Sequence, residues 1–123
     1  MPVVEISNGE LLDRISILRI KDERIEDPSQ REHIARELSH LEAQGEQLLG
    51  EEQVAAEFAR LHEANRLMWD AMQEVYDWQG PYSDALNQTI MQVVKVNMDR
   101  AHAKARIDTI TESNLREAKS FFN

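Results

Sequence analysis

The chain has 123 residues, of which 41 % are hydrophobic and 30 % are charged, and its formal net charge at pH 7 is −9. This length fits one domain with one core, and the acidic balance argues against binding to nucleic acid, whose phosphates attract clustered lysine and arginine. The chain has no cysteine, which excludes disulfides, thiolate metal sites and cysteine nucleophiles. We expect a cytoplasmic protein that does not enter a membrane, because neither a signal peptide nor an apolar run of about 20 residues is found.

The first two predicted helices are separated by Asp27-Pro28. Ser7 and Glu10 have the spacing of a capping box, in which the serine hydroxyl accepts a hydrogen bond from a backbone N–H, so we predict a helix over 9–26. Ser29 and Glu32 repeat this spacing. They predict a second helix over 30–49 that ends at Gly50.

The third helix, predicted over 51–78, has the clearest periodicity. Its apolar residues alternate steps of four and three, which is a heptad pattern with one polar member. The positions are Val54, Phe58, Leu61, Asn65, Met68, Met72 and Val75.

A turn at Gly80-Pro81 precedes the fourth helix, which we predict over 83–110 with Ser83 as its cap. Its expected buried stripe consists of Leu86, Ile90, Val93 or Val94, Asn97 and Ala101. No element is assigned to the tail over 111–123.

These four helices predict an all-α fold, because no segment has the alternating pattern of a strand. Short connections favour antiparallel neighbours, so we expect a bundle of two helical hairpins in a single domain over residues 1–123. Dimerisation could complete its core.

Two asparagines are predicted to lie at the same depth in the second hairpin. Asn65 comes thirteen residues before Trp78, and Asn97 comes thirteen residues after Asp84, so each lies about 20 Å from the turn at 1.5 Å per residue. Facing amides either fix register and the choice of partner or line a polar pocket.

Basic residues that could lie near these asparagines occur on two helices. The first helix carries a polar stripe beside its apolar face, which includes Lys21 and Arg24, and the fourth helix adds Arg100 and Lys104. A solvated stripe would form ordinary surface ion pairs. A buried stripe would place cations and amide donors around a carboxylate or phosphate.

Other catalytic arrangements are not found. The four glycines form no phosphate-binding loop, and no nucleophile has an evident base. A di-iron bundle needs two Glu-x-x-His motifs, and Glu37 with His40 forms the one we find. His33, His62 and His102 lack ligand spacing and are predicted at the surface. We therefore expect neither a metal nor a cofactor.

Four segments follow one another along the chain, namely "GELLDRISILRIKDERI", "ANRLMWDAM", "NMDRAHAKARID" and "NLREAKSFF". In this order they resemble the bacterial domain of unknown function family 6165, over nearly the whole chain. Arg19 and Asp22 depart from that family's pattern. The resemblance implies that the characteristic, ligand-binding positions are Glu10, Asp13, Lys21, Arg24, Asn65, Trp69, Asn97, Arg100 and Lys104.

That family has no established activity but includes members associated with glycosyltransferases and surface polysaccharides, so the resemblance implies a sugar nucleotide or a partner enzyme as the bound species. A weaker likeness, to the all-helical chorismate mutases, lies in the charged first helix and the segment "DPSQREHI". Here the segment from Asp27 to Arg31 is one residue too long for that motif, so the likeness concerns the general design and does not indicate membership of that family.

Three hypotheses follow. The first, which we favour, is a non-catalytic binding or interaction module for an anionic small molecule or a partner protein. The second is a structural oligomer, such as a homodimer, whose polar positions set register. The third is a small enzyme acting on an anionic metabolite, with Glu10 or Asp13 as general acid or base.

Overall fold

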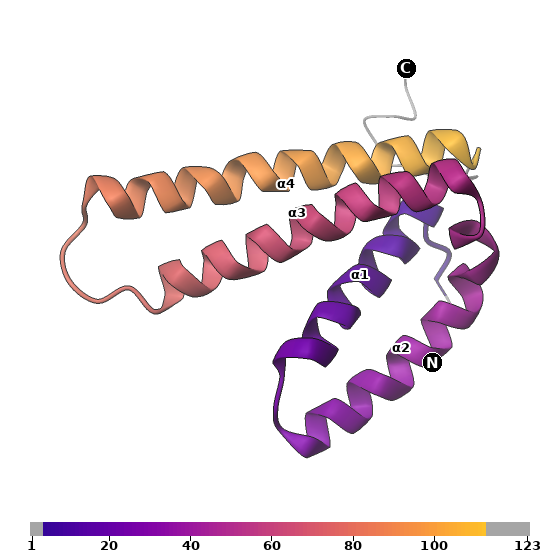
Figure 1. Ribbon diagram of the computed structural model, residues 1–123, viewed down its shortest axis with the longest axis horizontal. Helices are drawn as coiled ribbons and strands as arrows, with labels where there is room; N and C mark the ends of the chain where they lie inside the picture. The colour runs from indigo at the N-terminus through magenta and orange to yellow at the C-terminus, as the bar shows by residue number, and fades with distance from the viewer. Residues whose placement is uncertain (1–3, 113–123) are drawn as a thin grey trace.

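The computed structural model describes residues 4–112, which form four α-helices. Three short loops, 25–27, 50–51 and 77–83, join them into two antiparallel hairpins, α1 with α2 and α3 with α4 (Figure 1). The predicted all-α fold of two hairpins is confirmed, whereas the tail motif "NLREAKSFF" lies outside the described residues. The helices are α1 (Asn8–Arg24), α2 (Pro28–Leu49), α3 (Glu52–Tyr76) and α4 (Asp84–Ile110).

Side-chain caps start three of these helices. The Ser7 hydroxyl accepts from the Glu10 N–H at 3.1 Å, as predicted. The prediction of Ser29 as the second cap is wrong, because Asp27 caps α2 and Pro28 opens it. Proline suits the first helical position, where its fixed φ is helical and its missing N–H is not needed.

The fourth helix begins as predicted, with the Ser83 hydroxyl accepting from the Leu86 N–H at 3.2 Å. The predicted ends of two other helices are too late. Helix α1 ends at Arg24 and α3 at Tyr76, about half a turn before the predicted positions. The loop 77–83 is correspondingly longer than the sequence indicated.

The core lies where the two hairpins meet. Buried aliphatic side chains from α1, α3 and α4 form its centre, and α2 covers α1 from the other side. Gly45 lets α2 approach closely, since a Cβ atom there would lie 2.8 Å from Ile15 Cδ1. The fully buried members include Leu12, Ile15, Val54, Leu61 and Ile107.

Helix α1 is shorter than α3 and covers part of the longer hairpin. With 17 residues it is about 26 Å long, whereas α3 with 25 residues is about 38 Å long. Figure 1 shows that the end of the α3–α4 hairpin with loop 77–83 extends away from α1 and α2. The predicted α3 heptad is therefore buried as far as Asn65, while Met72 is 55 % exposed, contrary to the prediction of a continuous buried seam.

Candidate functional site

A buried carboxylate joins α1 to α4. Asp13 is 1 % exposed and accepts two hydrogen bonds from Arg100, from Nε at 2.9 Å and from a terminal nitrogen at 2.5 Å. Lys104 lies 2.7 Å from Glu10 and 4.0 Å from Asp13. Such bidentate, charge-assisted pairs are strong and directional, so they fix the position of α1 along α4.

The amide of Asn65 extends this cluster to α3. Its Nδ2 atom donates to Asp13 Oδ1 and to Ser16 Oγ, both at 3.0 Å. Ser16 Oγ in turn lies 2.9 Å from His62 Nδ1. Because the serine oxygen accepts from the amide, its own hydrogen is available for the imidazole nitrogen. The network thus links three helices through one chain of polar contacts.

His62 belongs to this network and does not lie fully on the surface, which corrects the sequence prediction. Burial, followed by the nearby Arg19 charge, lowers the pKa of His62 below its ordinary value. A neutral imidazole can accept the Ser16 hydrogen bond at Nδ1. The histidine is therefore a structural acceptor at neutral pH.

The cations of the cluster are paired with carboxylates of the chain, and Glu10 also lies 3.3 Å from Arg14. Two cations, Arg100 and Lys104, lie against two carboxylates, Asp13 and Glu10. An anion site needs cations whose charge is not already matched by the protein. The polar stripe of α1 is thus buried at Asp13. Its carboxylates already neutralise Arg100 and Lys104, as a bound anion would otherwise do.

Two other predicted site residues lie elsewhere. Arg24 pairs with Asp70 at 2.5 Å, and this hydrogen bond raises the pKa of Arg24 above its ordinary value. Lys21 lies in a separate depression between α1 and α2, with Leu18 and Ile25. The structure therefore does not bring these two cations to Asn65.

The predicted pairing of Asn65 with Asn97 is wrong, because Asn97 is exposed and Asn65 bonds to α1. The reason is the rotation of α4. Its buried positions include Val96, Ala103 and Ile107, and a residue next to Val96 is turned about 100° away from that side.

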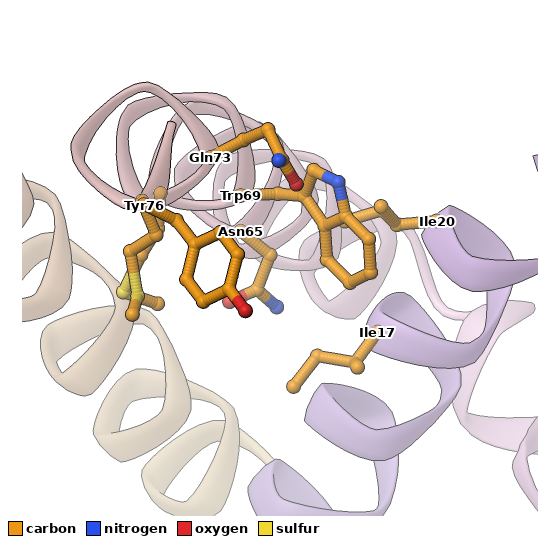
Figure 2. Close-up of a pocket in the computed structure, with 8 residues that line it drawn as sticks. Ile17, Ile20, Asn65, Trp69, Gln73 and Tyr76 are labelled. Atoms are coloured by element: carbon orange, nitrogen blue, oxygen red, sulfur yellow. The ribbon is translucent and has the colours of Figure 1, made fainter. Parts of the chain in front are cut away.

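A cavity of about 350 Å³ opens beside Asn65, between α1 and α3. In Figure 2 the side chains of Asn65, Trp69 and Tyr76 from α3 line this cavity, and Ile17 lies on the facing helix α1. Trp69, the remaining predicted site residue, thus lines this cavity. Apart from the amides of Asn65 and Gln73, the walls are apolar or aromatic, and they comprise Ile17, Ile20, Met68, Trp69, Met72 and Tyr76.

Three residues of the site were not predicted. Ser16 and His62 have no sequence signal, since they lie 46 positions apart. Asp108 accepts from the Gly9 N–H at 2.7 Å and binds the start of α1 to α4. Asp108 lies four residues after Lys104 and therefore on the same side of the helix. This spacing is the sequence feature that could have pointed to Asp108.

Comparison of the chain with known protein families gave no match, and neither a curated protein nor a solved structure is significantly similar to it. The resemblance to family 6165 therefore stays a prediction. Among residues 4–112, no helix has both the length and the apolar character to cross a bilayer. In the same part of the chain, no group of three histidine, aspartate or glutamate side chains is arranged to hold a metal ion.

Proposed function

We propose that the protein is a non-catalytic helical interaction module that assembles as a homodimer through the outer side of α4. The observation that carries the proposal is a set of exposed apolar side chains. Ten large hydrophobic side chains are exposed in the described part of the chain, and nine of them lie between Leu67 and Met98. Exposed apolar side chains that gather on one side of a helix mark a contact surface.

Part of this set forms a second heptad pattern on α4. The outer seam, with alternating steps of four and three, consists of Asn87, Met91, Val94, Met98, Ala101 and Ala105. Met91, Val94 and Met98 are 56, 48 and 56 % exposed. Heptad spacing on one helix is the pattern that a second helix packs against, and Figure 1 shows α4 along one edge of the molecule.

The charge pattern supports the same surface. No charged residue occurs from Ala85 to Val94, although 30 % of the chain is charged. Depletion of charge is typical of interface cores. A second copy fits this surface best, because two identical heptad seams can pack on each other with two-fold symmetry.

Anion binding and catalysis have less support. Arg100 and Lys104 are already matched by Asp13 and Glu10, and Arg106 of the same helix pairs with Glu57. Asp13, a candidate general acid or base, accepts hydrogen bonds from Arg100 and Asn65, which hold it in a structural role. The proposal therefore keeps the interaction module predicted from the sequence and replaces its anionic ligand with an apolar contact.

Sedimentation equilibrium of the wild type and of Val94→Asp tests the proposal. Two aspartates brought together in an apolar interface should weaken the dimer by at least about tenfold in Kd, since each loses its hydration there. Ala35→Asp, which adds the same charge at an exposed position of α2, should dimerise like the wild type. A wild type that stays monomeric would contradict the proposal, and so would a Val94→Asp dimer of unchanged affinity.

A further inference from the structure

We infer that the cavity between α1 and α3 is a binding site for a small aromatic molecule that carries one N–H or O–H donor, such as an indole or a phenol. The inference is independent of the proposed dimer, because the cavity lies on α1 and α3 and the outer seam lies on α4. Its volume of about 350 Å³ is near the lower end for ligand sites, which suits a small ring system.

The walls of the cavity select an apolar ring. Trp69 and Tyr76 offer aromatic faces, and the side chains of Met68 and Met72 lie with them. Aromatic rings pack well against one another edge to face or offset. Methionine adapts its shape to what it contacts and favours sulfur–aromatic contacts. A charged ligand would lose its hydration here without a matching charge.

One polar atom of the cavity lacks a partner. Asn65 is 3 % exposed, and its Oδ1 atom makes no hydrogen bond in the described structure. Its orientation is fixed, because rotating the amide by 180° would turn the oxygen toward the Asp13 carboxylate and remove two hydrogen bonds. A buried acceptor without a donor is costly, so a ligand donor at this position would satisfy it.

The ligand reaches Oδ1 past the rim of the cavity. The amide oxygen is itself covered, whereas the lining residues Met72 and Tyr76 are 55 and 87 % exposed. Exposed side chains change rotamer on a timescale of nanoseconds or faster, so the outer part of the cavity adapts to a ligand while the core packing stays intact. The network from Asp13 to Ser16 holds the amide in place while the rim moves.

NMR titration with indole and with 1-benzothiophene tests the inference. The two ring systems have similar shapes, but benzothiophene has no N–H donor. Indole should shift the methyl signals of Met68 and Met72 in a saturable way and leave those of Met91 and Met98 unchanged. Benzothiophene should bind about fivefold more weakly, as expected for one net hydrogen bond of about 1 kcal/mol.

Ile17→Trp, which fills the cavity, should abolish the indole shifts, and Val94→Trp, outside the cavity, should leave them unchanged. The monomeric Val94→Asp variant should bind indole like the wild type, which separates this test from that of the dimer. Equal affinity for both ring systems, or no shifts at millimolar indole, would overturn the inference. Tighter binding of N-acetyl-tryptophanamide than of indole would also overturn it, in favour of a protein side chain.

Discussion

Asp13 is the residue on which the packing of the two hairpins depends. It is the acceptor for Arg100 of α4 and Asn65 of α3, so one carboxylate sets the positions of three helices. Removing one member of a buried ion pair leaves the other charge without a partner, which costs more than the pair contributes. Because removing the Asp13 carboxylate costs more than the ion pair contributes, the role of Asp13 in stability can be measured.

We expect Asp13→Asn to lower the free energy of unfolding by about 3 kcal/mol, because Arg100 keeps its charge without the carboxylate. Urea denaturation measures the change. Glu32→Ala removes an exposed pair with Arg36 and should cost less than about 1 kcal/mol. Equal effects of the two substitutions would show that the Asp13 cluster has no special role.

The lowered pKa of His62 predicts a pH dependence of stability. The unfolded chain binds a proton near the ordinary histidine pKa of about 6.5, while the folded chain binds it at lower pH. Stability is therefore full above about pH 6.5 and falls as the pH is lowered toward the folded pKa. Denaturation between pH 7.5 and 5.5 should show this loss in wild type and His102→Gln but less in His62→Gln. A loss of the same size in His62→Gln would contradict the assignment.

Each helix of the fold could be predicted from caps and apolar periodicity, but the rotation of α4 could not. This helix carries two apolar heptads, one that includes Val96 and Ala103 and the outer seam with Met91 and Met98. Either can face α3 on periodicity alone. Packing against α1 through Arg100 and Asp13 decides the rotation. The predicted stripe with Leu86, Ile90 and Asn97 contains no partner for α1, so its periodicity could not reveal this rotation.

The close contact of α1 with α4 depends on Gly9. A Cβ atom there would overlap the backbone oxygen of Lys104, whereas a Cβ atom at Gly50 would meet no atom closer than 3.4 Å. Gly9→Ala should therefore destabilise the fold by about 2 kcal/mol through overpacking. Gly50→Ala, at a helical φ of −74°, should stabilise it by about 0.5 kcal/mol. Thermal unfolding measures both, and a Gly9→Ala variant as stable as the wild type would contradict the close contact.

At the scale of the whole molecule, the two hairpins differ in what covers them. The side of the α3–α4 hairpin that packs against α1 is buried, and other sides of it display apolar side chains such as Met72, Met91 and Met98. The sequence indicated a possible dimer but not the surface that would form it. That surface can be chosen only once it is known which apolar heptad of α4 packs against α1 and α3. The outer seam of α4 stays exposed in the single chain, with Met91 and Met98 each 56 % exposed.

We propose that a second copy of the chain covers the outer seam. Methyl NMR with a soluble paramagnetic probe, recorded at high and at low protein concentration, tests it most directly. We predict that the Met91 and Met98 methyl signals are protected from the probe at high concentration and broadened at low concentration, as the dimer dissociates. Equal broadening of both signals at every concentration would contradict the claim.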